Sequence, residues 1–300
     1  MRKLTNAAGT RLALFGAALV AVFAIASVAG AALDVGSGIE TGEEEGHGEE
    51  AMAMDGGEEH GDEHAEDSGP AGLAVAEEGY RLELTRDALR SGREGTVAFR
   101  VLDEDGHTVE DFETEHERRM HMIVVRRDLS GFQHLHPEQL ADGSWRTELT
   151  VAEAGDYRVY ADFVTAGESL TLASDMLVPG RFEPRALPAE SSVADAGDGY
   201  EVRLAETGED ELTFEVSRNG DPVEGVQPYL GADGHLVVLR EGDGAFLHAH
   251  PLGEPGGSGP IRFMVDYPSA GAYRLFLQFK HDGEVHTAAF TRHEGGHSHE

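Results

Sequence analysis

The chain has 300 residues and a formal net charge of -34 at pH 7, because 57 acidic residues outnumber 23 basic ones. Nucleic acids and anionic membrane surfaces bind basic patches, so this charge argues against both as partners. The absence of cysteine excludes disulfides, thiolate nucleophiles and cysteine-ligated zinc or copper centres. Any metal ion must therefore be held by histidine, methionine, aspartate or glutamate.

Residues 12–33 carry no charge, and such a run is long enough to cross a bilayer as a helix. Three basic residues precede the run, which predicts a cytoplasmic segment at residues 1–11 and an extracytoplasmic remainder. The alternative is a secretory signal cleaved near residues 29–31, which would make the protein secreted. The run is longer than a usual signal core, so we favour an uncleaved transmembrane helix and a single-pass protein of the cell membrane.

Residues 34–72 consist mainly of Gly, Glu, Asp and Ala, with a few histidines and methionines. Such a segment has too little apolar surface to offset its ordering entropy, so we expect a disordered acidic linker. The tail at residues 293–300 also contains histidines and leads to the same expectation. These histidines either belong to a solvated spacer or form a weak trap for divalent cations.

From residue 80 onward, apolar and polar residues alternate in short runs separated by turn-forming residues, which predicts β-strands. Seven such runs in about a hundred residues are typical of an immunoglobulin-like β-sandwich. We therefore expect an all-β protein with two tandem sandwich domains, at residues 73–179 and 199–292, joined by a linker at residues 180–198. The expected strands lie near residues 80–84, 95–102, 119–127, 131–136, 144–151, 156–164 and 168–177, and near residues 200–205, 211–217, 234–240, 245–250, 260–266, 272–280 and 284–291.

The pattern His-x12-His-x-His-Pro occurs twice, and the two copies are offset by 114 residues without a gap. Nearby residues share the offset, as Gly106 does with Gly220, so internal duplication explains both copies. A second repeated pattern, Gly-x-Tyr at residues 155–157 and 271–273, suggests a tyrosine corner in each domain. The alternative for these aromatic residues is plain core packing, which we adopt at this point.

The turn at residues 128–129 decides which way the histidines of the first copy face. If these residues form the centre of a hairpin, His121 lies opposite His136, and strand alternation places His134 on the same face. Opposed and diagonal positions are about 4.5–8 Å apart, so three imidazoles could converge on one ion, and the second copy has the same spacing. We therefore predict metal ligands at His121, His134, His136, His235, His248 and His250.

Three imidazoles suit copper or zinc and leave one coordination position open. Met120 and Met122 flank His121, and their soft thioethers favour copper over zinc. In the structural alternative, the histidines brace the hairpins by hydrogen bonds and the duplicated fold inherits them. Six matched histidines are, however, a costly way to fill a core. Further candidate outer ligands are Glu115, His116, His281 and His286.

An enzymatic function has weaker support. Residues 242–254 have the Gly, His-x-His and Glu spacing of the first half of a cupin metal motif, but no second half follows. The same His-x-His resembles that of copper–zinc superoxide dismutase, whose remaining ligands and cysteines are absent. No Ser-His-Asp order, phosphate loop or dinucleotide fingerprint stands out. We expect no enzymatic activity, and a cupin-like or dismutase-like metalloenzyme is the third hypothesis.

Residues 119–137 and 228–251, which contain the two histidine motifs, resemble a group of bacterial cell-envelope proteins with paired His-x-His-Pro β domains. The resemblance extends over residues 75–292, and some members of the group are described as heavy-metal-binding. It implies an envelope location and tandem β domains. A looser similarity to small periplasmic copper-carrying β-sandwiches implies delivery or sequestration rather than catalysis.

These patterns predict a membrane-anchored extracytoplasmic protein that binds a transition metal, copper before zinc, for sequestration or handover. Its expected partners are the membrane, through the N-terminal helix, the metal ions, and another metal-handling envelope protein. The alternative is a non-catalytic structural or interaction module of the cell envelope, whose histidines only brace the β-hairpins.

Overall fold

The structure is a computed structural model, and it describes residues 70–85, 89–206 and 210–295. The expected membrane span at residues 12–33 and nearly all of the acidic linker lie outside these residues. Within them, no helix is long and apolar enough to cross a membrane. The described part of the chain is all β, as its sequence predicts, and its strands form antiparallel sheets.

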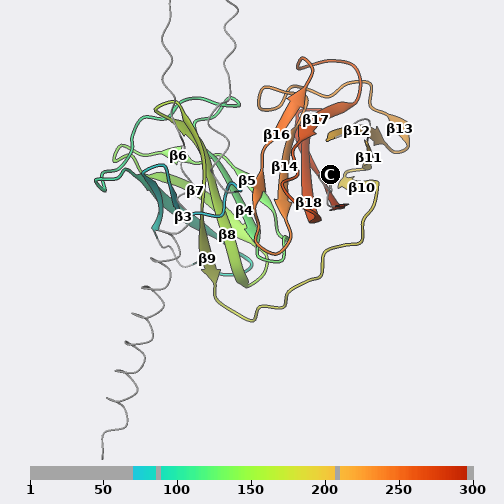
Figure 1. Cartoon of the computed structure of the whole chain (residues 1–300). Coiled ribbons are helices and arrows are strands. Elements are labelled where there is room, and N and C mark those ends of the chain that lie inside the picture. Colours follow the sequence, from blue (N-terminus) through green and yellow to red (C-terminus); the bar gives the residue numbers. More distant parts are fainter. Residues whose placement is uncertain (1–69, 86–88, 207–209, 296–300) are drawn as a thin grey trace, which may run out of the picture. The chain divides into compact units, whose positions relative to one another are not determined.

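The first sandwich contains nine strands, coloured blue to olive in Figure 1. They are β1 (Ala76–Glu77), β2 (Tyr80–Thr85), β3 (Arg93–Leu102), β4 (His121–Arg126), β5 (Gln133–Leu135), β6 (Glu138–Gln139), β7 (Trp145–Val151), β8 (Gly155–Thr165) and β9 (Glu168–Val178). One sheet has the strand order β1-β2-β3-β7-β6, and the other has the order β5-β4-β8-β9.

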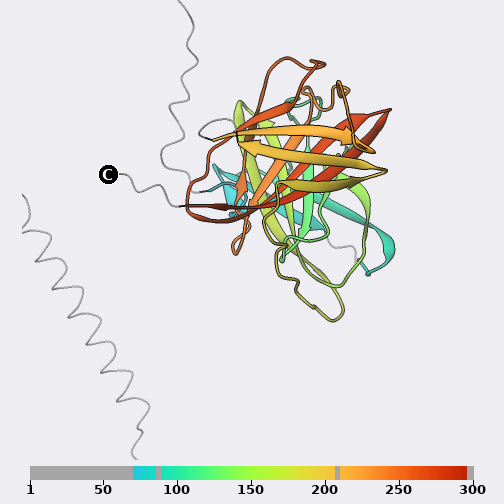
Figure 2. The ribbon, with the colours of Figure 1, turned by 90° about the vertical axis from the view of Figure 1, so that its right-hand side faces the viewer.

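The second sandwich contains the remaining strands, and Figure 2 shows its gold strands β11 and β12 running antiparallel at the front. They are β10 (Val193–Gly197), β11 (Tyr200–Glu206), β12 (Glu211–Arg218), β13 (Asp221–Pro222), β14 (His235–Arg240), β15 (Phe246–Leu247), β16 (Ala249–Leu252), β17 (Ile261–Val265), β18 (Gly271–His281) and β19 (Glu284–Glu294). The sheet orders are β10-β11-β12-β17-β16, with β13 beside β12, and β15-β14-β18-β19.

The two sandwiches match strand by strand, which supports the internal duplication. Strands β10, β11, β12, β17 and β16 repeat the order of β1, β2, β3, β7 and β6, and β15-β14-β18-β19 repeats β5-β4-β8-β9. The strands expected from the residue pattern are present, except that the one expected at residues 245–250 is divided into β15 and β16, which belong to different sheets. The short strands β1, β6, β10 and β13 were not expected. Because β10 pairs with β11, the second sandwich begins at Val193, before the expected boundary at residue 199.

Each sandwich has its own core between its two sheets, one built around Trp145 and the other around Tyr200. Both sandwiches contain the tyrosine corner that the Gly-x-Tyr pattern suggested, so these tyrosines do more than fill the core. The Tyr157 hydroxyl donates to the carbonyl of Glu153 at 2.8 Å, and the Tyr273 hydroxyl donates to that of Ser269 at 2.7 Å. Each corner fixes the start of a long strand, β8 or β18.

Strand β4 is buried on both faces, because the sheet that contains it lies between two apolar layers. Met122 and Val124 point into the core of the first sandwich, whereas Ile123 and Val125 belong to a third apolar cluster. This cluster also contains Val237, Leu239, Phe246 and Phe276 of the second sandwich. The outer faces of the β4 and β14 sheets therefore pack against each other.

Contacts across this junction are reciprocal, as in an interface with approximate two-fold symmetry. Phe132 stacks on Phe276 with ring centroids 4.1 Å apart, and Phe246 lies 5.8 Å from Tyr160. Phe246 is the counterpart of Phe132 (246 − 132 = 114), and Phe276 is the counterpart of Tyr160 (276 − 160 = 116). Each copy thus uses equivalent residues to bind the other, and the junction brings the two histidine motifs into one region.

Candidate metal centre

Two histidines begin the two central strands that face each other across the junction. His121 is the first residue of β4, and His235 is the first residue of β14. Alternation along each strand places them on the outer face with Ile123 and Val237, at the rim of the apolar contact. Their rings lie nearly parallel with centroids 5.7 Å apart.

A third imidazole completes the group that we call the histidine triad, His121, His134 and His235. One ring nitrogen from each of these residues lies within 4.8 Å of the others. The closest approach is 3.0 Å, between His121 Nδ1 and His134 Nε2, and the His134 and His235 rings stack at 4.6 Å. Two ligands come from the first sandwich and one from the second, so a bound ion would join both copies.

Carbonyl oxygens hold the outer nitrogens of two triad rings. His121 Nε2 donates to the backbone carbonyl of Glu115 at 3.2 Å, and His134 Nδ1 donates to Oε1 of Gln278 at 2.8 Å. Gln278 in turn donates from Nε2 to Thr287 Oγ1 at 3.3 Å. Histidines that bind metal are commonly oriented by such an outer hydrogen bond, which frees the other nitrogen for the ion.

The inner nitrogens of these two rings then have a conflict that a cation would remove. With both rings neutral and both outer nitrogens protonated, His121 Nδ1 and His134 Nε2 direct two lone pairs at each other over 3.0 Å. A positive ion between them turns this repulsion into two ligand bonds. The metal-free protein can also remove this repulsion if the Gln278 amide is flipped. Its NH2 group would then donate to His134 Nδ1, and a proton on His134 Nε2 would be donated to His121 Nδ1.

Burial disfavours the charged form of the triad imidazoles. Loss of water is the main cause of each shift: it lowers the pKa of His121, lowers the pKa of His134 to about 3, and lowers that of His235 well below its usual range. Burial and the nearby His121 lower the pKa of His136 to about 4. Neutral imidazole is the form that binds metal, so these residues need not lose a proton first.

His136 lies beside the triad and has a free nitrogen. Its ring centroid is 5.1 Å from that of His121 and 4.8 Å from that of His134. Its Nε2 atom is buried and has no hydrogen-bond partner among the described residues. A buried polar atom without a partner costs about 1–3 kcal/mol, so this nitrogen is a candidate for a fourth ligand.

His116 is the exposed member of the region. Its ring centroid lies 6.1 Å from that of His121 and 6.0 Å from that of His235, and its backbone has φ of 47°. The equivalent residue of the second copy is Leu230 (230 − 116 = 114), which has φ of 56°. The turn is therefore common to both copies, but only the first places an imidazole in it.

The predicted hairpin register is confirmed in the first copy. Met122 pairs with Leu135 and Ile123 pairs with His134, so His121 and His136 occupy opposed positions at the end of the same hairpin. The register of the second hairpin is also the predicted one, because Val238 pairs with Leu247. The conclusion that each copy builds its own triad nevertheless fails in the second copy.

The second-copy histidines separate because the chain changes sheets at His248. Strand β15 ends at Leu247, and β16 pairs with β17 of the other sheet, where His250 is exposed opposite Met264. The His248 ring turns to the first sandwich, with Nε2 3.3 Å from Asp162 Oδ1. His235, His248 and His250 therefore do not converge, and the cupin-like spacing builds no metal site here.

Met122 does not face the triad, which corrects one argument for copper. Met120 and Met122 are both buried in the core of the first sandwich, on the face opposite His121. Two of the possible outer ligands also lie elsewhere: His281 Nδ1 is 2.7 Å from the Tyr200 hydroxyl, and His286 packs on the same tyrosine. The group that converges among the described residues, His121, His134 and His235, therefore offers imidazole nitrogens alone.

Three residues that touch the histidines across the junction were missed from the sequence: Thr171, whose hydroxyl lies 3.2 Å from His248 Nε2, and the pair Asp162 and Gln278. Asp162 and Gln278 occupy equivalent positions (278 − 162 = 116), and each is a buried polar residue between apolar neighbours in a long strand. That isolated polar residue in an apolar run was the available signal. What could not be inferred was that each one binds a histidine of the other sandwich.

No curated protein is detectably similar in sequence to the chain. Three solved structures resemble it: an Escherichia coli adhesin, FdeC (14% identity, 72% of this chain, 65% of that chain, TM-score 0.25), a Salmonella alpha-2-macroglobulin mutant (16%, 75%, 15%, 0.27) and bovine butyrophilin (10%, 71%, 98%, 0.21). The chain thus spans less than two thirds of the first two proteins. At these scores the likenesses carry no argument.

A family model matches both sandwiches, at residues 74–180 and 193–295. The match covers well over half of the chain and follows the two structural copies, including β10 at the start of the second. The chain therefore belongs to the family described as a domain of unknown function, DUF8832.

Proposed function

We propose that the chain binds one transition-metal ion through His121, His134 and His235, and that it sequesters or hands over that ion in the cell envelope. The observation that carries the proposal is the facing pair of imidazole nitrogens, His121 Nδ1 and His134 Nε2, 3.0 Å apart. Their outer nitrogens are held by carbonyl oxygens, so both lone pairs are directed inward.

The dimensions of the triad support a single small ion. Metal–nitrogen bonds of about 2.0–2.1 Å place two tetrahedral ligands about 3.3 Å apart. The His121–His134 pair needs to open only slightly to reach this spacing, and His235 already has a nitrogen within 4.8 Å of both. The fourth position falls to His136 or to an external ligand.

We still propose copper before zinc, although the methionines no longer supply the reason. An all-imidazole donor set suits both metals, and divalent copper binds nitrogen ligands more tightly than zinc in the general order of affinities. A site that discriminates little by geometry would therefore favour Cu(II) wherever both ions are present.

The envelope setting rests on the uncharged run at residues 12–33, which we propose anchors the protein with its sandwiches outside the cytoplasm. We further propose that each sandwich is an immunoglobulin-type module. The order β2-β3-β7-β6 opposite β5-β4-β8-β9 corresponds to strands A-B-E-D and C′-C-F-G of that fold, and the second copy repeats it. Both tyrosine corners support the same assignment.

A second candidate function is a structural or interaction module of the envelope. The observation that favours it is that two histidines bind across the junction, His134 to Gln278 and His248 to Asp162. In this case the histidines only fasten the sandwiches together. Their removal would then loosen the protein without any change in metal affinity.

The test is calorimetric titration of the metal-free full-length chain with Cu(II), Cu(I) and Zn(II). Two variants form a matched pair, His134→Ala and His248→Ala, because the residues are equivalent in the two copies and both bind across the junction. We expect one tight equivalent in the parent and in His248→Ala, and its loss in His134→Ala. The histidines near both termini are present in all three proteins, so their weak binding cancels.

Equal binding by the parent and both variants would overturn the metal proposal. A folded parent without a tight equivalent would do the same and leave the structural function. An intermediate test uses Gln278→Leu, which removes the carbonyl that orients His134 but no ligand. Loss of such an outer partner typically weakens metal binding about 10- to 100-fold.

The pH dependence of binding follows from the lowered pKa values. Proton competition weakens a site of ordinary imidazoles below about pH 6.5. Because burial lowers the pKa of His134 to about 3, the triad should retain its ion to lower pH than that. Titration at pH 7.5, 6 and 5 measures this, and a tenfold loss for each pH unit below 6.5 would show that the ligands are exposed histidines.

A further inference from the structure

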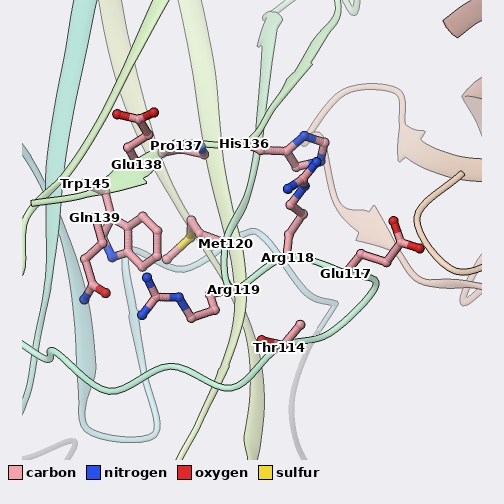
Figure 3. Close-up of a pocket in the computed structure, with 10 residues that line it drawn as sticks. All are labelled: Thr114, Glu117, Arg118, Arg119, Met120, His136, Pro137, Glu138, Gln139 and Trp145. Atoms are coloured by element: carbon pink, nitrogen blue, oxygen red, sulfur yellow. The ribbon is translucent and has the colours of Figure 1, made fainter. Parts of the chain in front are cut away.

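A cavity of about 490 Å³ opens in the first sandwich, on the side of His136 away from the second copy's strands. Arg118, Arg119, Met120 and Trp145 line it together with His136, and Figure 3 shows these side chains around it. Its volume falls in the range of small-molecule sites. His121, His134 and His235 do not line this cavity, and only His136, the candidate fourth ligand, belongs to both.

Two arginines give the cavity a positive side. Neither Arg118 nor Arg119 forms an ion pair with any described residue, although acidic residues greatly outnumber basic ones in the chain. Arg119 lies over the Trp145 ring at 5.7 Å, and Figure 3 shows Arg118 extending toward His136. The carboxylates of Glu117 and Glu138 lie at the outer edge in this view and point away from the other groups.

Buried polar atoms without partners also gather here. Among the described residues, Nε1 of Trp145 and Nε2 of His136 are both buried and lack a hydrogen-bond partner. Trp145 is only 2% exposed, so its N–H group has no access to bulk water. Such atoms are rare in folded proteins and call for an explanation, and here the two belong to residues that line one cavity.

The second copy shows that the fold does not require these side chains. The counterparts of Arg118 and Arg119 are Ala232 and Asp233 (offset 114), and Ile261 replaces Trp145 (261 − 145 = 116). The strands around them keep the same order in both sandwiches. The arginines and the tryptophan are therefore a property of the first copy alone, as expected of a binding site added to a common scaffold.

We propose that this cavity binds a small organic carboxylate, held by the guanidinium groups of Arg118 and Arg119. A planar carboxylate accepts two parallel N–H bonds from one guanidinium, a charge-assisted pairing that is stronger than a neutral hydrogen bond. The unpartnered N–H of Trp145 is a further donor beside the cavity. This inference goes beyond metal binding and does not depend on it.

The chain itself supplies the reporter for a test, because Trp145 is its sole tryptophan. Metal-free full-length protein is titrated with acetate, succinate and citrate, with inorganic phosphate as a second arm and sodium chloride at matched ionic strength. Tryptophan fluorescence is recorded throughout. We expect a saturable change with at least one carboxylate and none with chloride.

The variants are Arg118→Ala and Arg119→Asp, each of which introduces the residue found in the second copy. We expect each to weaken carboxylate binding about tenfold or more, the effect of losing a charged hydrogen bond. Arg81→Ala, which changes an exposed arginine on another strand, is the matched control and should bind like the parent. A urea midpoint equal to that of the parent confirms that each variant folds.

The proposal is overturned if no carboxylate gives a saturable change in the folded parent, or if the two cavity variants bind like the control. Preference for phosphate over every carboxylate would overturn the ligand class. His134→Ala should bind carboxylate normally even if it loses metal. The two proposals therefore fail separately.

Discussion

The two sides of the junction differ at one pair of equivalent residues, Asp162 and Gln278. Each accepts a hydrogen bond from a histidine of the opposite sandwich, His248 or His134. Burial opposes the charged form of His248, but the hydrogen bond and charge of Asp162 outweigh it and raise the pKa of that imidazole. Gln278 carries no charge, and burial lowers the pKa of His134 to about 3. The carboxylate of Asp162 thus favours an ion pair with His248, whereas the amide of Gln278 leaves His134 as a neutral imidazole that can bind a metal ion.

The copies also differ where their hairpins end. In the first copy His136 stays beside His121, whereas in the second copy His250 lies in the other sheet. The second copy has two more residues between the His-Pro motif and the tyrosine corner: Pro137 to Tyr157 spans 20 positions and Pro251 to Tyr273 spans 22. Duplication copied the ligand types, but the longer connection did not preserve their geometry.

The largest expected contrast between the copies involves Arg126 and its counterpart Arg240. Arg126 is 2% exposed and binds Asp128 at 2.6 Å and Glu153 at 2.5 Å, whereas Arg240 is 18% exposed and binds Asp243 and a serine. Arg126→Met leaves the buried carboxylate of Asp128 without its ion-pair partner and should cost about 3–5 kcal/mol of unfolding free energy. Arg240→Met should cost about 1 kcal/mol, because its partner is partly solvated. Urea unfolding of both variants measures the difference, and equal losses would contradict it.

Gly72 offers a second contrast, between a crowded and an open glycine position. It lies between the two sandwiches, near the first of the described residues. Its amide donates to Thr171, and the preceding carbonyl accepts from the amide of Phe246. With φ of +69°, an added Cβ would lie 2.8 Å from the Tyr160 ring and 2.9 Å from Phe246. Gly72→Ala should therefore cost about 2–4 kcal/mol.

The matched control is Gly106→Ala, at φ of +81° with no atom within 4 Å of the added Cβ. It carries only the cost of left-handed backbone, about 1 kcal/mol. Thermal unfolding of the two variants compares them directly. A loss at Gly72 no larger than that at Gly106 would mean that the junction opens easily to admit a methyl group.

Asp162→Asn tests whether the carboxylate makes the difference between the two sides. Without the charge, the pKa of His248 should fall, and its imidazole signals in an NMR titration should move to a lower midpoint. The raised pKa of His248 stabilises the folded state fully below about pH 6.5, and this contribution disappears as pH rises through the folded-state pKa. The lowered pKa of Asp162 stabilises it above about pH 4, with loss as pH falls.

The parent should therefore exceed Asp162→Asn in stability most clearly between about pH 4 and 6.5, and less at pH 8.5. Because the His248 side chain is 44% exposed, the difference should remain below about 1 kcal/mol. Urea midpoints at pH 5.5 and 8.5 measure it. A difference that grows with pH would have the wrong sign and contradict the ion pair.

Local features of the sequence were enough to predict the strands, the duplication and the hairpin register, and they suggested the tyrosine corners without separating them from plain core packing. Strand alternation and turn length set the faces of His121, His134 and His136, and those faces are as expected. The apolar run from Met122 to Val125 could in principle have indicated a strand buried on both faces. These are relations between residues close together in the chain or in adjacent strands.

The packing of one sandwich on the other was not predictable in the same way. Alternation shows that Ile123 and Val125 must be covered, but not which surface covers them. The place of His235 in the triad and the partners Asp162 and Gln278 depend on that packing. His250 lies away from the triad because the chain changes sheets at His248. The second copy also has two more residues than the first between this point and its tyrosine corner.

The smallest effect on stability is expected for a change at His116. Its effect on metal affinity shows whether His116 is a ligand or only a neighbour of the triad. His116→Leu introduces the residue of the second copy, where Leu230 holds the same turn at φ of 56° against 47°. Stability should change by less than about 0.5 kcal/mol, because the backbone already accepts leucine and the imidazole is exposed. If the triad alone binds the ion, calorimetry should show less than about a tenfold change in affinity, since even outer partners commonly contribute that much. A loss as large as that of His134→Ala would instead make His116 a ligand. In that case the same turn would carry a metal ligand, His116, in the first copy and a leucine, Leu230, in the second.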